Sequence, residues 1–333
     1  MDRDIDWVKP VVVLLIAQHV AAFSMSRAIG YDQRPPTVSY MVMALVLATI
    51  GGFAILCRHL WWLWRLEEAH PIARLRSDTD WTAVISYFLG FQLVALQIAA
   101  LTWLKEILPW TVPFWADPAL AAFDRALLGV DAWRLFPEWA VAPLDAIYIF
   151  WGPFKFFVLI LMLVLPPSRL KSQAVLSYFL TVGIVGVAGQ YLLSSVGPVF
   201  YDQYQGSSDF AALTSRIHEH APVVVKASEH LWQAYSGGYS AIGGGISAMP
   251  SVHVATTTWA ALALTRFWRF AAVPAWAFWL LIVAGSVALG WHYLADGIAG
   301  AAGALGCWYL APRLLRWLAG NPRLSTAAPA EQS

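Results

Sequence analysis

Charged side chains are scarce in this sequence. Asp, Glu, Lys and Arg account for 12% of its 333 residues, while 59% are hydrophobic, whereas about a quarter of an average soluble domain is charged. So little charge excludes an ordinary soluble fold, and we predict a membrane protein. The net charge is only +1. Such a balance creates no field that would attract a nucleic acid, and we expect no nucleic acid partner.

Cysteine is rarer still. The two cysteines, Cys57 and Cys307, fall at or within apolar runs. Their spacing fits neither a disulfide framework nor a zinc site, so we interpret them as reduced packing residues. His218, His220 and His230 have no cysteine or ordered set of carboxylates beside them. We therefore predict no metal site.

Long apolar runs, by contrast, are abundant. Eight of them approach the length of about 20 residues that a helix needs to cross a bilayer, and we predict an all-α protein with about eight spans. The first run follows the acidic start MDRDID, which indicates a retained helix and not a cleaved signal peptide. The runs cover residues 7–23, 38–57, 81–104, 146–165, 173–194, 251–268, 272–289 and 292–310.

The basic residues are sorted by loop. Arg and Lys gather between the second and third runs, between the fourth and fifth, between the sixth and seventh, and after the eighth. By the positive-inside rule these loops face the cytoplasm. We therefore expect a multi-pass protein of the cytoplasmic membrane with both termini inside. The long segments 105–145 and 195–250 then lie outside.

The two outer segments differ in composition. Residues 116–145 mix apolar residues at helical spacing with charges and prolines, which indicates one or two short helices in the membrane interface. In the second segment, TSRIHEHAPVVVKASEHLWQAY could form a helix, and SGGYSAIGGGISAMPS is rich in Gly and Ser. The glycine-rich stretch is either a flexible linker or a loop whose backbone N–H groups approach an anion. We favour the loop because of the residues that follow it.

Three polar residues stand at the outer ends of apolar runs. His253 begins the sixth run, and His292 and Asp296 begin the eighth. The i to i+4 spacing of His292 and Asp296 puts both side chains on one face of a helix, where the carboxylate can accept the imidazole N–H. The other ring nitrogen is then free to attack an electrophile, and His253 could protonate the leaving oxygen. A single interfacial histidine is usually only a satisfied polar residue, but two histidines and an aspartate on one membrane face favour catalysis.

These residues lie in motifs of a known family. MPSVHVA (249–255) and GWHYLADGIAG (290–300) resemble the second and third signature motifs, P-S-x-H and H-x-x-x-D, of the type 2 phosphatidic acid phosphatase (PAP2) superfamily. The resemblance covers residues 190–309 and implies a six-helix catalytic bundle at the outer leaflet. It implies that His292 forms a phosphohistidine and that Asp296 orients it. It also implies that His253 is general acid and then base, that Ser251 holds phosphate oxygens, and that no metal or cofactor is required.

Three cationic positions of the family pattern are replaced here. The first motif, K-x6-R-P, aligns with QYLLSSVGP, which puts Gln190 at the lysine and Gly197 at the arginine, and Ser286 stands where the third motif usually has an arginine. A phosphomonoester dianion would lose several charge-assisted hydrogen bonds, whereas a phosphodiester carries one negative charge and needs less compensation. The pattern is therefore similar to the inositol phosphorylceramide synthase-like branch. The two additional N-terminal runs and FDRALLGVDAW (123–133) also resemble that branch.

Other residues could hold the phosphate instead. Lys155 is a lone cation inside the fourth run, where an ionisable residue is a functional candidate. It could equally snorkel to the interface or pair with an acid such as Asp145. Tyr201 and Asp202, which follow Pro198, could line the headgroup pocket, and a structural turn would explain them nearly as well.

The sequence thus predicts two N-terminal spans and a cytoplasmic loop in residues 1–80, a catalytic bundle in 81–318 and a disordered tail in 319–333. We expect the enzyme to transfer a phospho-headgroup, such as inositol phosphate, from a phospholipid to a lipid or alcohol acceptor, so its partners are membrane lipids. Two alternatives stay open. One is a lipid phosphatase that acts on phosphatidate or polyprenyl pyrophosphate, and the other is a non-catalytic lipid-binding or transport protein.

Overall fold

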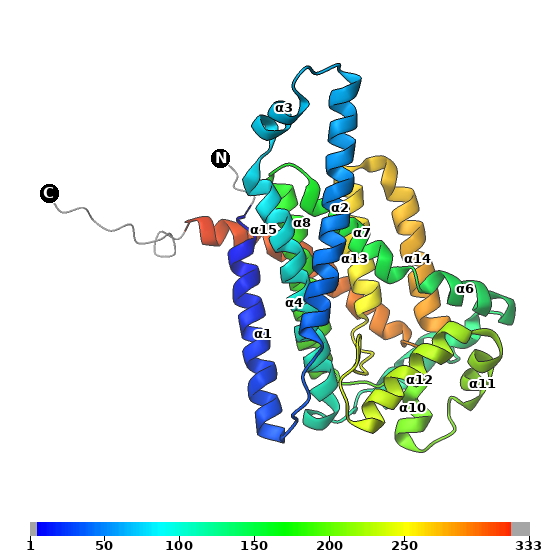
Figure 1. The fold of residues 1–333 in the computed structure, drawn as a ribbon. Coiled ribbons are helices and arrows are strands. Elements are labelled where there is room, and N and C mark those ends of the chain that lie inside the picture. Colours follow the sequence, from blue (N-terminus) through cyan, green and yellow to red (C-terminus); the bar gives the residue numbers. More distant parts are fainter. Residues whose placement is uncertain (1–4, 321–333) are drawn as a thin grey trace.

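The computed structural model describes residues 5–320, and throughout these residues the regular structure is helical, as predicted. Long helices run side by side, and several short helices gather at one end of them (Figure 1). The helices are α1 (Val8–Ile29), α2 (Thr37–Arg65), α3 (Pro71–Asp78), α4 (Trp81–Thr111), α5 (Asp117–Leu128), η1 (Ala132–Leu135), η2 (Glu138–Ala140), α6 (Val141–Tyr148), α7 (Trp151–Val164), α8 (Arg169–Leu180), η3 (Thr181–Gly189), α9 (Gln190–Leu192), α10 (Pro198–Gln205), α11 (Ala211–His220), α12 (Pro222–Gly237), α13 (Val252–Phe267), η4 (Arg269–Ala271), α14 (Ala272–Ala288) and α15 (Leu294–Gly320).

Seven helical segments of the described chain are long and apolar enough to cross a membrane. They are α1, α2, α4, the run from η2 to α7, the run from α8 to α9, η4 with α14, and α15. The remaining predicted span corresponds to α13, whose 16 residues are fewer than a bilayer crossing requires. Because α13 packs against α7, α14 and α15 and is buried along most of its length, it forms the centre of the bundle. The prediction of a polytopic membrane protein is confirmed.

Helices α1 and α2 expose large apolar side chains, such as Phe23 and Phe53, which suits contact with lipid. Polar side chains join both helices to α4. Gln97 of α4 donates to Gln18 of α1 at 2.9 Å, and Gln92 of α4 donates to the Met41 carbonyl of α2 at 3.4 Å. Such bonds hold helices together where there is no hydrophobic force between them.

Helix α4 is longer than the run 81–104, because it continues to Thr111. Lys105 and Glu106 therefore lie within the helix and not in a loop. The Glu106 carboxylate accepts hydrogen bonds from the Ser240 hydroxyl at 2.9 Å and the Ala241 N–H at 3.0 Å. The apolar run is interrupted at Lys105, but the helix continues, and the glycine-rich loop supplies hydrogen-bond donors for the next residue, Glu106.

The short helices α5, α10, α11 and α12 cover the end of the bundle that lies opposite α3 (Figure 1). The stretch that was expected to form one helix in the second outer segment forms two, α11 and α12, because Pro222 begins a new helix. The glycine-rich stretch forms a loop that is pressed onto α4. A Cβ atom at Gly245, where φ is +90°, would lie 2.4 Å from Cβ of Lys105.

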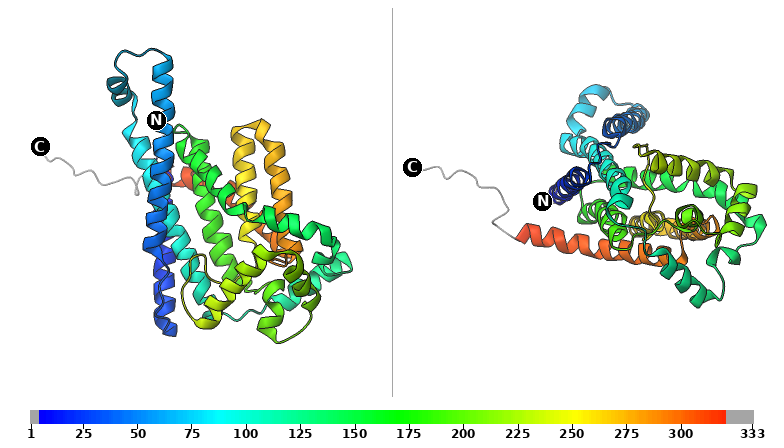
Figure 2. Two further views of the ribbon diagram at one scale, coloured as in Figure 1. Left: turned by 45° about the vertical axis from the view of Figure 1, so that its right-hand side comes forward. Right: turned by 90° about the horizontal axis from the view of Figure 1, so that it is seen from below.

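Helix α15 crosses the bundle obliquely. Seen from below, α1 is viewed nearly end-on while α15 extends across the molecule (Figure 2). Residues 319 and 320, the first two of the predicted tail, belong to α15. The rest of that tail, from residue 321, lies outside the described residues.

Candidate active site

The second motif forms the start of α13. Ser251 is the N-cap residue, and its buried Oγ accepts a hydrogen bond from the Val254 N–H at 3.2 Å. Its own N–H donates to the Asp296 carbonyl at 3.0 Å, which ties α13 to the first turn of α15. The contact of the Ser251 hydroxyl with a phosphate oxygen, which the resemblance implies, stays a prediction.

The close approach of α13 and α15 depends on a glycine. A Cβ atom at Gly300 of α15 would lie 2.4 Å from the Ser251 carbonyl oxygen. That contact is with backbone, which cannot move aside as a flexible side chain can. Only glycine therefore allows the two motif-bearing helices to meet at this distance.

The third motif surrounds the start of α15. Asp296 lies in the first helical turn, and its Oδ2 accepts the Tyr293 N–H at 3.0 Å. The N–H groups of Leu294 and Ala295 donate to Asp124 of α5 at 2.8 and 3.2 Å. Carboxylates thus satisfy the free N–H groups at this helix start. The spacing had suggested that His292 and Asp296 share one face of a helix. In the structure His292 precedes α15, so its contact with Asp296 forms across the helix start.

His253, His292 and Asp296 form a hydrogen-bonded line. His292 Nδ1 is 3.3 Å from Asp296 Oδ2, and His292 Nε2 is 3.1 Å from His253 Nδ1. Because an ionised carboxylate can only accept, we assign a proton to His292 Nδ1. His292 Nε2 then carries a lone pair, which accepts the N–H of His253 Nδ1. The structure therefore brings together the two histidines and the aspartate that the sequence singled out, and their catalytic roles stay a prediction.

Aromatic rings enclose His253. The ring centroid of Trp151 lies 4.1 Å from that of His253, and the ring of Tyr148 lies 5.2 Å from it. Trp151 Nε1 also donates to Thr256 Oγ1 at 2.9 Å, which fixes the indole against α13. Lys155 Nζ lies 3.5 Å from the Trp151 ring centroid, in a cation–π contact. One indole thus joins the Lys155 ammonium to the surroundings of His253.

Two ammonium groups act on this site. The charges of Lys105 and Lys155 both act on His253, and Lys105 also acts on Lys155. Over residues 5–320, neither ammonium has an ion pair or a hydrogen bond. Asp145, which had been considered as a partner for Lys155, accepts two N–H groups at the start of α12 instead, at 2.9 and 3.0 Å. Like charges without a counter-ion beside a histidine pair favour an anion as the ligand.

The loop of the first motif, residues 193–197 between α9 and α10, holds a carboxylate of the chain itself. We call this segment the first-motif loop. Asp117 accepts the N–H groups of Val196 and Gly197 at 2.8 Å each, and the hydroxyls of Ser195 at 2.9 Å and Tyr293 at 3.2 Å. Burial raises the pKa of Asp117, and these hydrogen bonds act against that rise.

Two predicted phosphate-binding residues belong to this loop or precede it. Gly197 has a φ of +86°, and a Cβ atom there would lie 2.8 Å from the Trp291 carbonyl oxygen, so an arginine could not replace it. Its N–H faces Asp117 and is not available to a phosphate, which corrects the prediction for Gly197. Gln190 is buried, and its Oε1 has no partner among the described residues. Its contact with phosphate stays a prediction.

Tyr201 and Asp202 lie on α10. The Asp202 carboxylate accepts the Ser207 hydroxyl at 2.7 Å and the Phe210 N–H at 3.0 Å, so it holds the turn that follows α10. This agrees with the structural alternative that the sequence left open, and a role of Asp202 in headgroup binding stays a prediction. The Tyr201 ring packs edge to face with Phe210 at 5.1 Å, and its place beside the headgroup stays a prediction.

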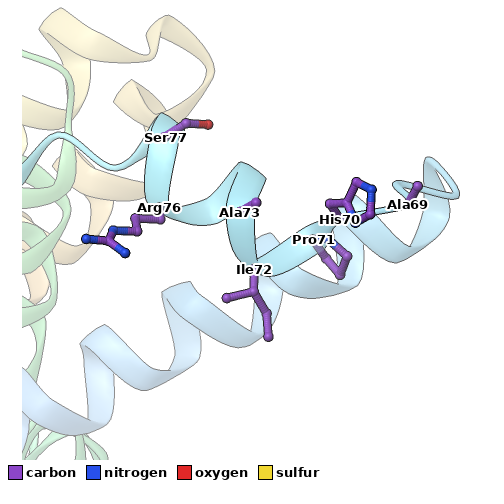
Figure 3. A pocket seen from close by; sticks show the side chains of 7 residues that line it. All are labelled: Ala69, His70, Pro71, Ile72, Ala73, Arg76 and Ser77. Atoms are coloured by element: carbon purple, nitrogen blue, oxygen red, sulfur yellow. The ribbon is translucent and has the colours of Figure 1, made fainter.

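A wide hollow lies elsewhere, at the turn before α3. It is lined by Ala69, His70, Pro71, Ile72, Ala73, Arg76 and Ser77. These side chains come from one short segment and point in different directions (Figure 3). The hollow contains no group of converging polar side chains and is not a candidate site.

Sequence reasoning missed Lys105, Asp117 and Asp124. Lys105 was placed in an outer loop because the apolar run stops at Leu104. The two aspartates act on residues more than seventy positions away, and no local pattern marks them. The prolines and charges of segment 116–145 indicated interfacial helices, but not what their carboxylates contact.

The comparisons with known proteins gave one match. A family model described as the PAP2 superfamily matches residues 119–310, which is more than half of the chain. No curated protein and no solved structure matches.

Proposed function

We propose that this chain, which belongs to the PAP2 superfamily, moves the phospho-headgroup of a membrane phospholipid to the hydroxyl of a lipid or alcohol acceptor. Enzymes with this domain are phosphatases or phosphotransferases, so the reaction is phosphoryl chemistry at His292. The proposal concerns the acceptor, which is a hydroxyl group and not water. Inositol phosphate is the headgroup that the sequence resemblance favours.

The hydrogen-bonded line of Asp296, His292 and His253 is the observation that carries the proposal. The carboxylate at one nitrogen holds the ring and its tautomer, and the other nitrogen keeps a lone pair. His253 Nδ1 lies 3.1 Å from His292 Nε2, the nitrogen that carries this lone pair. A phosphate that reaches His292 Nε2 therefore has to enter beside His253, which puts an acid next to the bond that breaks.

In the first step, His292 Nε2 attacks phosphorus and the bond from phosphorus to the diacylglycerol oxygen breaks. The departing oxygen takes a proton from protonated His253. In the second step, neutral His253 removes the proton of the acceptor hydroxyl, whose oxygen attacks phosphorus while the nitrogen–phosphorus bond breaks. Asp296 stabilises the positive charge on His292 between the two steps.

Burial of the site favours a lipid acceptor over water. The His292 side chain is 4% exposed, and His253 lies among aromatic rings. A site that excludes water protects a reactive phosphohistidine from hydrolysis. The first-motif loop, which carries cations in the family pattern, is held by Asp117 and offers no positive charge. A phosphodiester, with one negative charge, suits such a site.

A phosphatase is the second candidate, and a specific observation favours it. Lys105 and Lys155 together supply two positive charges near His253, which could balance a phosphomonoester dianion. The same histidines would then activate water in the second step.

The deciding experiment supplies headgroup-labelled phosphatidylinositol to purified protein in mixed micelles, with and without ceramide. We expect label in a new lipid only when an acceptor is present, and its loss in His292→Ala. His218→Ala, on the exposed face of α11, is the matched control and should keep full activity. Release of water-soluble label at the same rate without acceptor would show a hydrolase and overturn the proposal.

A further inference from the structure

An apolar groove runs along the membrane-facing side of the bundle between α2, α4 and α7. Its free volume is about 60 Å³. Met43 and Leu47 of α2 line it and are 50% and 46% exposed, so the groove is open at its α2 edge. It is lined by Tyr40, Met43, Ala44, Leu47, Phe91, Val94, Ala95, Ile98, Phe156, Leu159, Ile160 and Leu163.

On α4, the groove leads to Lys105. Phe91, Val94 and Ile98 follow one another at the three- and four-residue spacing that keeps side chains on one helix face. Continuing at the same spacing, Thr102 and Lys105 lie on that face beyond Ile98. The apolar stripe on α4 therefore ends in a cation.

On α7, the groove leads to Lys155. Leu163, Leu159 and Lys155 are each four residues apart and share a helix face. Lys155 Nζ also lies 5.0 Å from the ring of Phe156, another residue of the groove. The chain runs along α4 toward the end with the short helices and along α7 away from it (Figure 1). Both lysines therefore lie at the same end of the groove.

Tyr40 of α2 lies at this polar end as well. Its hydroxyl is 3.2 Å from Thr102 Oγ1 and accepts the Gly243 N–H at 2.8 Å. Gly243 belongs to the glycine-rich loop that leads to Ser251. The polar end of the groove is thus connected to the second motif.

We propose that this groove holds one hydrocarbon chain of the phospholipid donor, with the phosphate of that lipid on Lys105 and Lys155 beside His253. This inference rests on the proposed function and names the lipid site of that reaction. The groove is apolar and ends in two ammonium groups that have no ion pair among residues 5–320, which matches an amphiphile with an anionic head. A neutral or cationic lipid would leave both charges uncompensated. Helices α2 and α4 lie outside the matched residues 119–310, so the lipid site would be completed by the N-terminal half of the chain.

The test uses a phosphatidylinositol that carries a photoreactive diazirine at the end of one acyl chain. It is cross-linked to the purified full chain in micelles, without turnover, and the labelled peptides are mapped. We expect label on groove residues of α2, α4 and α7. A diacylglycerol with the same diazirine, which lacks the phosphate, should label them about tenfold less, because the charge-assisted bonds to the lysines are lost.

Two variants of α2 sharpen the test. Leu47→Trp fills the groove from its exposed edge, whereas Leu45→Trp places the same side chain on a 51%-exposed position outside the groove. We expect Leu47→Trp to reduce groove labelling about tenfold and Leu45→Trp to leave it unchanged. Equal labelling in both variants, or label confined to other helices, would overturn the proposal. Groove labelling without headgroup transfer would instead contradict the proposed function alone.

Discussion

His292 has both ring nitrogens specified by neighbours, Asp296 at Nδ1 and His253 at Nε2. The Asp296 Oδ2 that accepts from the ring also accepts the Tyr293 N–H, so the same carboxylate holds the helix start and the reactive ring. A substitution of Asp296 therefore affects both the His292 ring and the start of α15.

Asp296→Asn should lower the transfer rate by roughly 10³- to 10⁴-fold, because an amide can donate to His292 Nδ1 and so favour the wrong tautomer. The Tyr293 N–H donates to the same Oδ2 position, so an amide nitrogen there loses that bond, and we also expect a lower unfolding temperature. Initial rates with labelled phosphatidylinositol and a thermal unfolding curve check both parts. A rate within tenfold of wild type would show that Asp296 does not set the tautomer.

Lys105→Met and Lys155→Met should each lower kcat/KM by about tenfold, because each removes one positive charge from the phosphate site. Lys226→Met, on the exposed face of α12, is the control for loss of a lysine and should have no effect. Steady-state kinetics of the three variants measure this. Equal transfer rates for wild type and Lys155→Met would exclude Lys155 from the site.

At the scale of elements, the candidate active site is a junction of two helix starts and a short helix. The Ser251 N–H joins the start of α13 to the first turn of α15, and Asp124 of α5 caps that turn. The Asp117 carboxylate joins the start of α5 to the first-motif loop. Each contact joins segments that are distant in the sequence, so moving one helix start moves the histidine pair.

Gly300→Ala should reduce activity at least tenfold, because the new methyl group would lie 2.4 Å from the Ser251 carbonyl oxygen and force α15 away from α13. Gly306→Ala is the matched control in the same helix, since a Cβ atom there meets nothing within 4 Å. That variant should keep its activity and gain up to about 1 kcal/mol of helix stability. Activity and thermal unfolding of the pair distinguish a packing effect from a helix-propensity effect.

At the scale of the whole molecule, the two ends of the bundle differ. The short helices α10, α11 and α12 lie at one end, and α3 lies at the other (Figure 1). The histidine pair belongs to the starts of α13 and α15, and α3 carries Arg74 and Arg76. The positive-inside rule predicts that the end with α3 faces the cytoplasm. We therefore propose that the active site opens to the outer leaflet of the cytoplasmic membrane.

A labelling experiment tests this orientation. In a Cys57→Ser background, Ser207→Cys should react with a membrane-impermeant maleimide in intact cells, and Ser77→Cys should react only after the cells are permeabilised. Both serines are exposed in short loops or helices outside the bundle, and Cys307 is buried. Reaction of position 77 but not of 207 in intact cells would invert the proposed topology.

The sequence by itself determined the fold class and indicated which side chains we propose as the reacting groups. Apolar runs of bilayer length leave an all-helical membrane protein as the outcome, because every backbone polar group in lipid has to be satisfied within its own segment. The motifs around His253 and His292 identified the histidine pair because the chemistry requires those residue types.

The tertiary structure decided what surrounds that pair. Lys105 is a candidate phosphate ligand because α4 continues past the apolar run. Lys155 of α7 lies at the same end of the groove. Gly197 lost its predicted role because Asp117, seventy-eight to eighty positions from the loop residues that it binds, occupies that loop. Such contacts depend on which helix starts meet in space, and one-dimensional patterns record only spacing along the chain.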